Sequence, residues 1–268
     1  MIDTHSHILP GLDDGTEDLE QALSAARIAV QDGIERVICT PHWISGIFEN
    51  TRSIVMAAIE SFEQHLQEHN IPLVLYPGAE LRVNLEIPAK IARGALLTLN
   101  ESAYALIELP AEIIPPRIED FFYNLQVQGL TPVIAHPERN PGVARDPGRL
   151  YGWIESGVLA QLTAGSLLGK FGGTIRKFCL LLLEHGMVHL IATDCHGQMN
   201  RAPRLSKALR EAEAMVGKTL AAQIFCENPL EIINRGTVTP FELSPLGRRF
   251  SLSVKKYFSF PGWGKSQG

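Results

Sequence analysis

The sequence is poor in cysteine, in long apolar runs and in positive charge. Its 268 residues contain four cysteines and no Cys-x-x-Cys pair, which is typical of reduced thiols rather than of a disulfide framework. Apolar runs such as Cys179–Leu183 are too short to span a bilayer. The first residues lack the basic and apolar segments of a secretory signal. These absences predict a cytoplasmic protein with no transmembrane segment.

The charge balance argues against a further class of protein. Lysine and arginine number 24 against 29 aspartate and glutamate, which gives a net charge of -5. Because nucleic-acid-binding domains normally present a basic face, we expect no nucleic-acid partner. Hydrophobic residues make up 45% of the chain, which is enough apolar material for a large globular core.

Strand-like apolar runs alternate with segments of helical periodicity. Strands are predicted at Met1–His5, Arg36–Thr40, Leu73–Tyr76, Tyr104–Leu109, Pro132–Ala135, Leu159–Thr163 and Val188–Thr193. Helices are predicted at Thr16–Asp32, Ile54–His69, Ile118–Gly129, Arg149–Gly157, Ile175–His185 and Ala202–Val216. Several strand runs are continuously apolar, as expected for parallel strands covered on both faces. Seven strand–helix units favour a distorted seven-stranded (β/α)7 TIM-like barrel over residues 1–239; an open doubly wound sheet is the alternative.

Residues 240–268 differ in composition from the rest of the chain. Five basic residues are mixed there with aromatic ones such as Phe250, Tyr257 and Trp263. We expect a basic-aromatic C-terminal tail that packs on the barrel or stays mobile. A contact with a membrane or partner is the second interpretation.

Metal-capable side chains follow six of the seven predicted strands. They are His5, His7, Asp14, His42, Glu80, Glu108, His136, Asp194 and His196. The carboxyl ends of barrel strands face one rim, so we expect these nine donors to converge there. Imidazole and carboxylate ligands suit Zn²⁺, Mn²⁺ or Fe²⁺, and nine donors exceed what one ion binds. The pattern therefore predicts two or three divalent ions.

Two arginines and the remaining histidines complete the site prediction. Arg139 and Arg201 follow the fifth and seventh predicted strands, where each could donate two N–H groups to a phosphate. The histidines left outside the site are His65, His69, His185 and His189. The first two are expected on a solvated helix face, and the last two at the opposite end of the strands.

Longer segments resemble one family in particular. "MIDTHSHILPGLDDG", "IAHPER", "QLTAGSLLGKFG" and "ATDCHGQMNR" are similar to the bacterial PHP-superfamily protein-tyrosine phosphatases of capsule and exopolysaccharide operons. The resemblance covers residues 1 to about 229 and implies a PHP-type barrel with a manganese-favouring trinuclear site, where Fe, Zn, Mg or Co are other occupants. It also implies a substrate, namely phosphotyrosine on a bacterial tyrosine kinase. Departures from the family pattern are Ala79, Asn140 and Cys195.

The resemblance also distributes the ligands among the ions. It implies that His5, His7, Glu80 and Asp194 hold one ion. Glu80 then bridges to a second ion shared with Glu108 and His136. The third ion is held by Asp14, His42 and His196. In this interpretation Arg139 and Arg201 bind the phosphate, Asp13 is a turn residue, and a metal-held hydroxide attacks phosphorus in line with the departing phenolate.

Three alternative functions are compatible with parts of the sequence. Cys195 and Arg201 satisfy the Cys-x5-Arg pattern of cysteine-dependent tyrosine phosphatases, although we expect this short match to be coincidental. A second alternative is another hydrolase of the same type, such as a histidinol-phosphate phosphatase or an amidohydrolase. The third is a metal-bearing scaffold without turnover.

Overall fold

The computed structural model describes residues 1–199, 201–239 and 241–245. Within them the strands form two sheets, and every neighbouring pair is parallel except β3 with β4. The first sheet has the order β1 (Ile2–Ser6), β2 (Arg36–Cys39), β5 (Val74–Pro77). The second has the order β10 (Leu190–Ala192), β9 (Leu159–Thr163), β8 (Thr131–Ala135), β7 (Tyr104–Glu108), β6 (Glu80–Arg82), β3 (His42–Ile44), β4 (Phe48–Glu49).

The two sheets arise because two strands are interrupted. Only Thr40 and Pro41 separate β2 from β3, and only Gly78 and Ala79 separate β5 from β6. Pro41 has no N–H to donate to a ladder. A Cβ on Gly78 would lie 2.7 Å from Ile38 Cγ2, so the close approach of the chain there requires glycine.

All seven predicted strands are present, and the α/β class with parallel strands is confirmed. The prediction of one closed seven-stranded barrel is not matched by the hydrogen-bonded ladders, which remain two sheets. An isolated parallel bridge joins Ser6 to Cys195. Strands β3, β4 and β6 were not expected from the sequence.

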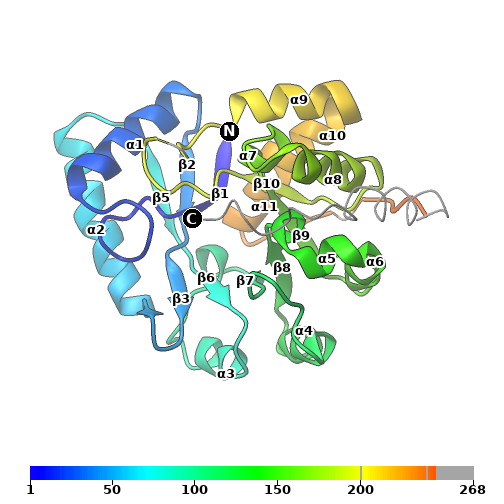
Figure 1. The fold of residues 1–268 in the computed structure, drawn as a ribbon. Coiled ribbons are helices and arrows are strands. Elements are labelled where there is room, and N and C mark those ends of the chain that lie inside the picture. Colours follow the sequence, from blue (N-terminus) through cyan, green and yellow to red (C-terminus); the bar gives the residue numbers. More distant parts are fainter. Residues whose placement is uncertain (200, 240, 246–268) are drawn as a thin grey trace.

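Helices lie around the outside of the strands (Figure 1). The six predicted ones are α1 (Leu19–Gln31), α2 (Arg52–Glu68), α4 (Ile118–Val127), α6 (Pro147–Glu155), α8 (Gly173–Glu184) and α9 (Ser206–Val216). Shorter ones are α3 (Ile87–Ala92), α5 (Pro141–Arg145), α7 (Ala164–Leu167), α10 (Lys218–Ala222) and α11 (Asn228–Ile233). Tight turns occur at η1 (Leu99–Glu101) and η2 (Pro137–Arg139), and a π-helical turn occurs at η3 (Gln223–Glu227).

The start of α1 differs from the prediction. The helix begins at Leu19 rather than at Thr16, and the Asp18 carboxylate caps it by accepting the Gln21 N–H at 2.9 Å. Thr16 is buried in the preceding loop, where its hydroxyl donates to the Ile8 carbonyl at 2.9 Å. This bond holds the loop between β1 and α1 against the end of β1.

The beginning of the predicted tail packs on the folded body. The Phe241 ring stacks on His189 with centroids 5.7 Å apart, and the Ser244 N–H donates to the His185 carbonyl at 3.2 Å. Residues 240 and 246–268, which carry most of the basic-aromatic prediction, lie outside the described residues. Among the described helices, none has both the length and the apolar character to cross a membrane.

Candidate metal centre

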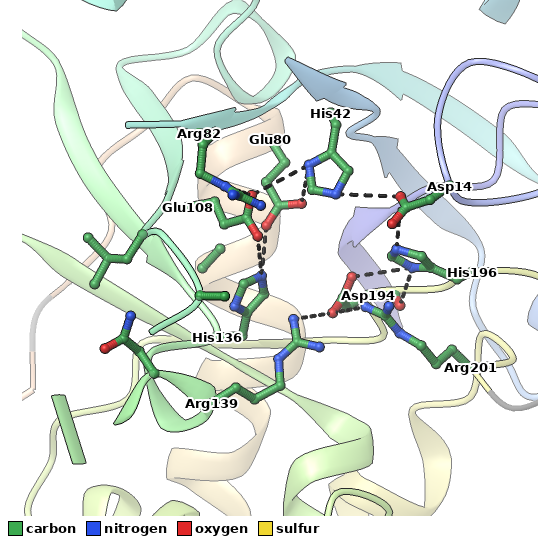
Figure 2. Close-up of a pocket in the computed structure, with 14 residues that line it drawn as sticks. Asp14, His42, Glu80, Arg82, Glu108, His136, Arg139, Asp194, His196 and Arg201 are labelled. Atoms are coloured by element: carbon green, nitrogen blue, oxygen red, sulfur yellow. Dashed lines mark hydrogen bonds and ion pairs between the residues drawn. The ribbon is translucent and has the colours of Figure 1, made fainter. Parts of the chain in front are cut away.

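Seven of the nine predicted donors line one pocket of about 210 Å³ (Figure 2), and the other two, His5 and His7, lie against its lining residues Glu80 and Asp194. They come from the ends of β1, β3, β6, β7, β8 and β10 and from the loops that follow. Two of them, His136 and Asp194, have positive φ values of 34° and 52°. Non-glycine residues adopt this left-handed conformation at a cost, and it is concentrated at functional sites. Here it falls at the first residues after the fifth and seventh predicted strands.

One group of four ligand atoms comes from His5, His7, Glu80 and Asp194. The two histidine Nε2 atoms are 3.2 Å apart, and each lies 3.2 Å from Glu80 Oε2. Each also lies 3.5 Å from Asp194 Oδ1. Donors bound to one ion at about 2.0–2.2 Å are separated by about 3.0–3.6 Å. The two histidines and Glu80 therefore have the spacing of a single coordination shell, and Asp194 lies beside both histidines.

Neighbouring side chains fix the tautomers of both histidines. Gln161 donates its amide to Thr4 Oγ1, so its oxygen accepts from His5 Nδ1 at 2.8 Å. The Asp13 carboxylate accepts from His7 Nδ1 at 2.6 Å. Each Nδ1 thus carries the proton, and in the neutral ring each Nε2 directs a lone pair toward Glu80. Such carboxylate and amide partners are typical of metal-bound histidine.

A second group lies on the other side of Glu80. His136 Nε2 is 2.8 Å from Glu80 Oε1 and 3.9 Å from Glu108 Oε1. His42 Nδ1 is 3.1 Å from Glu80 Oε2 and 3.6 Å from Glu108 Oε2. Glu80 therefore faces both groups, as a bridging carboxylate would.

A third group contains Asp14. Its Oδ1 lies 3.5 Å from His42 Nε2 and 3.4 Å from His196 Nε2. The His7 and His196 rings are 4.2 Å apart. His42 thus has one nitrogen toward the second group and the other toward the third, a division that the sequence did not predict.

Burial and charged neighbours shift the pKa values of the carboxylates and imidazoles in the pocket. Burial alone would raise the pKa of Glu80, but His5 and His42 hold this pKa well below its usual range. Burial, followed by the Glu80 charge, raises the pKa of Glu108 to about 7. Burial lowers the pKa of both His42 and His136 to about 4, so these rings are neutral and free to act as ligands.

A divalent cation fits this donor set. His42 Nδ1 and Glu80 Oε2 are buried and face each other without a hydrogen bond from any described residue. Burial lowers the pKa of His5, but the charges of Glu80 and Asp194 raise it by more than burial lowers it. The pKa of His5 is therefore above its ordinary value. Without a cation, the arginines that pair with Glu108 and Asp194 and protons on buried histidines balance the carboxylates. A bound divalent ion would replace the histidine protons.

The two predicted arginines lie at the wall of the pocket and share one acceptor. Arg139 Nη2 donates to Asp194 Oδ2 at 2.6 Å, and Arg201 Nη2 pairs with the same oxygen. Both Nε–H groups are buried without an acceptor among the described residues. The Arg139 guanidinium also lies over the Phe171 ring, 5.2 Å from its centroid. Two arginines that line one pocket and keep donors without acceptors are suited to binding an anion with several oxygens.

Three further residues contribute to the site without having been predicted. Asp13, expected only as a turn residue, accepts from Gly15 N as a turn aspartate does, yet it also binds His7 Nδ1 and the His42 N–H. Arg82 donates to Glu108 Oε2 at 2.5 Å. Gln161 orients His5. The short "HILPGLDD" spacing was the available signal for Asp13, whereas nothing in the sequence distinguished Gln161.

Asn140, one departure from the family pattern, caps a helix. Its side-chain oxygen accepts the N–H groups of Gly142 and Val143 at 2.8 and 3.2 Å, and its amide donates to the Pro110 carbonyl at 2.8 Å. It also lines the pocket. An aromatic residue could not make these bonds, so here the position serves the start of α5.

The residues left outside the site are placed elsewhere. His65 and His69 are on or next to the exposed end of α2, and His189 is buried against Ala160 and Phe241. Cys195 is fully buried, and its thiol donates to the Gly197 carbonyl at 3.5 Å. Burial raises the pKa of Cys195 to about 12, which is the opposite of what a thiolate nucleophile requires.

The geometry can be compared with known proteins. A family model described as "Capsular polysaccharide synthesis, CpsB/CapC" matches residues 1–234. The chain belongs to the CpsB/CapC family. Among its relatives, the tyrosine-protein phosphatase YwqE of Bacillus subtilis (strain 168) is 38% identical over 249 residues, which is 93% of this chain and 98% of that protein. The tyrosine-protein phosphatase CpsB of Streptococcus pneumoniae is 30% identical over 238 residues, 87% and 98% of the two chains.

A solved structure supports the same assignment. It comes from work on YwqE of Bacillus subtilis and CpsB of Streptococcus pneumoniae, described as unique metal-dependent tyrosine phosphatases. It matches this CpsB/CapC chain with a TM-score of 0.89 at 38% identity and covers 92% of this chain and 100% of that one. The predicted family, and with it the predicted class of enzyme, a protein-tyrosine phosphatase, is confirmed.

Proposed function

We propose that this chain hydrolyses phosphotyrosine in proteins at a centre of two or three divalent ions, Mn²⁺ in the first place. The observation that carries this is the pair of arginines, each with a buried Nε–H that lacks an acceptor, beside three groups of metal-capable atoms, two of which share Glu80. The proposed ligands are the nine predicted donors, His5, His7, Asp14, His42, Glu80, Glu108, His136, Asp194 and His196.

Metal ions at such a site neutralise a phosphomonoester and lower the pKa of a coordinated water. The chain's own residues bind and orient the substrate. Arg139 and Arg201 each use one N–H on Asp194 and retain others for the phosphate oxygens, so they stabilise the charge that develops during the transfer. Asp194 holds both guanidinium groups in place. Because the phenol of tyrosine has a pKa near 10, its departure depends less on protonation than that of a serine alkoxide.

The family name directs the proposal for the substrate protein. CpsB/CapC proteins are described by capsular polysaccharide synthesis, and the named relatives are tyrosine-protein phosphatases. We therefore propose a phosphotyrosine-bearing bacterial tyrosine kinase that regulates capsule or exopolysaccharide synthesis as the substrate, and the cytoplasm as the place of action.

Two finer points of architecture belong to the same proposal. Joined across their interruptions, β2 with β3 and β5 with β6 give seven strand positions, and the Ser6–Cys195 bridge links the first to the last. This supports a distorted (β/α)7 arrangement of the PHP type over residues 1–239. Residues 240–268 then follow this unit as its C-terminal tail.

Metal analysis and hydrolysis measured on one preparation test the proposal. We expect purified protein to contain more than one equivalent of divalent metal, to lose phosphotyrosine-peptide hydrolysis in a chelator and to regain it with Mn²⁺. His7→Ala should lower metal content, and the matched control His65→Ala should not, because His65 is on the exposed face of α2. Hydrolysis unaffected by chelation would disprove the proposal, and a preference for histidinol phosphate would redirect it.

The buried thiol provides a second arm of the same experiment. Cys195→Ala should keep hydrolysis within about threefold of the original chain, because the group removed lies beneath the pocket rather than in it. A complete loss of turnover with normal metal content would favour the cysteine-dependent mechanism instead.

A further inference from the structure

A second hollow adjoins the metal centre. It has a volume of about 460 Å³ and lies between the α7 turn and the start of α9. Its charged lining residues are five cations and one acid, namely Lys170, Arg201, Arg204, Lys207, Arg210 and Asp32. We call this hollow the basic pocket. It stands out in a chain whose net charge is -5.

The single acid of the basic pocket is already engaged. Asp32 accepts the N–H groups of Leu205 and Ser206 at 2.6 and 2.7 Å and the Ser206 hydroxyl at 2.7 Å. Its carboxylate therefore satisfies the first donors of α9 rather than the basic side chains. No carboxylate among the described residues forms an ion pair with Arg204, Lys207 or Arg210. Their positive charge is left facing solvent and the hollow.

The basic pocket is continuous with the phosphate-binding side of the metal centre. Arg201 lines both, and Phe171, which lines the basic pocket, lies against the Arg139 guanidinium. A polypeptide whose phosphotyrosine reaches Arg139 and Arg201 must therefore pass close to the basic pocket with its neighbouring residues. Charge complementarity favours an anionic group at that point.

We propose that the basic pocket binds an anionic side chain of the substrate polypeptide, a carboxylate or a second phosphate, a few residues from the phosphotyrosine. This inference rests on the proposed function and specifies its substrate class. The pocket would then select acidic phosphotyrosine segments, while the chemistry remains at the metal centre. Small aryl phosphates would not reach it.

Matched peptides and variants test this assignment. The variant Arg204→Gln/Lys207→Gln/Arg210→Gln removes three exposed charges, none of which is in the metal centre. A control variant, Arg27→Gln/Arg93→Gln/Lys218→Gln, removes three exposed charges from positions that line neither pocket. Both are assayed on phosphotyrosine peptides flanked by Glu, by Gln or by a second phosphotyrosine, and on p-nitrophenyl phosphate.

We expect Arg204→Gln/Lys207→Gln/Arg210→Gln to raise KM at least tenfold, with kcat unchanged, for at least one of the two anionic peptides, the Glu-flanked or the doubly phosphorylated one. KM for the Gln-flanked peptide and for p-nitrophenyl phosphate should change less than twofold, and the control variant should resemble the original chain. Whichever anionic peptide responds identifies the anion. Equal KM values for all peptides in the original chain would overturn this inference alone, whereas absence of hydrolysis on every substrate would overturn the proposed function.

Discussion

Asp194 connects the metal side of the pocket with its phosphate side at the scale of one residue. Its Oδ1 lies 3.5 Å from His5 and His7 Nε2, and its Oδ2 accepts from both Arg139 and Arg201. Although burial opposes it, Arg139, His5 and Arg201 hold the pKa of Asp194 well below its usual range. A movement of the Asp194 carboxylate would therefore change the proposed metal coordination and the positions of Arg139 and Arg201 at the same time.

Removing either arginine should impair phosphate binding more than metal binding. We expect Arg139→Ala and Arg201→Ala each to lower kcat/KM for phosphotyrosine peptides by about 10²–10³-fold, the range found for lost transition-state donors. Metal content should persist, because the ion still compensates Asp194. Steady-state kinetics with elemental analysis of the same samples measures both. Loss of metal in step with activity would show that the arginines support the ligands instead of the phosphate.

Asp13 should control metal affinity without being a ligand. Asp13→Asn replaces the charged acceptor of His7 Nδ1–H with an amide that can also present its donor side. We expect a 10–100-fold weaker metal affinity, as for other partners of metal-bound histidines, measured by titration of the chelated protein with Mn²⁺. Asp18→Asn is a suitable control, because that residue caps α1. Equal affinities for the two variants would contradict the orienting role.

At the scale of elements, the sequence predicts long apolar strands and misses short ones at the site. The predicted strands contain apolar runs such as Pro132–Ala135, which form because such side chains are buried on both faces of the sheet. β3 and β6 have three residues each and begin at His42 and Glu80. Because these polar ligand candidates interrupt the apolar run, the sequence shows no strand pattern there. Arg82 was missed for the same reason. Its role depends on the pairing of β6 with β7, which places it opposite Glu108.

That the nine proposed ligands lie together was predictable, because each belongs to the end of a predicted strand or to the loop after it, and parallel strands bring their carboxyl ends together. Contacts between distant segments were not. Gln161 reaches His5 across 156 positions of sequence, and the division of His42 between two groups depends on ring orientation. Such contacts depend on how β9 is paired with its neighbouring strands and on the path of the loops. The periodicity of apolar residues in the sequence predicts neither.

His189, next to β10, should make stability depend on pH. Burial lowers its pKa from 6.5 to about 4, and its Nδ1 accepts the Ala160 N–H. Between these values the unfolded chain binds the proton and the folded chain does not, so this contribution is present above about pH 6.5 and is lost as pH falls toward 4. At pH 5 the loss is about 2 kcal/mol.

The variant His189→Asn keeps an acceptor and removes the titration. We expect the original chain to lose about 2 kcal/mol more free energy of unfolding than this variant between pH 8 and pH 5. Denaturant unfolding at both pH values measures the difference, and histidines elsewhere cancel between the two proteins. Parallel pH profiles would contradict the assignment.

At the scale of the whole molecule, the metal centre fastens together strands from both sheets. Its proposed ligands extend from His5 to His196 along the chain and come from β1 in one sheet and β3, β6 and β7 in the other. Ion binding should therefore stabilise the entire fold rather than one loop. Without an ion, the centre depends on the arginines and on histidine protons to balance its buried carboxylates.

Metal binding should raise the melting temperature. Mn²⁺ at about 100 times its dissociation constant stabilises by about 2.7 kcal/mol if the unfolded chain does not bind it, which for a chain of this size is roughly 5–10 °C. Calorimetry of chelated and reloaded protein measures the shift. A His7→Ala chain should show a smaller one, and an unchanged melting temperature in the original chain would contradict the coupling.

The link between β1 and β10 has a consequence for the order in which the protein matures. Asp3 accepts both the N–H and the hydroxyl of Thr193, and Ser6 bridges Cys195. A ribosome therefore releases His5 and His7 long before their partners Asp194 and His196 exist. Until some 190 further residues are made, the first strand lacks a neighbour on that side, so metal capture must be a late event of biosynthesis.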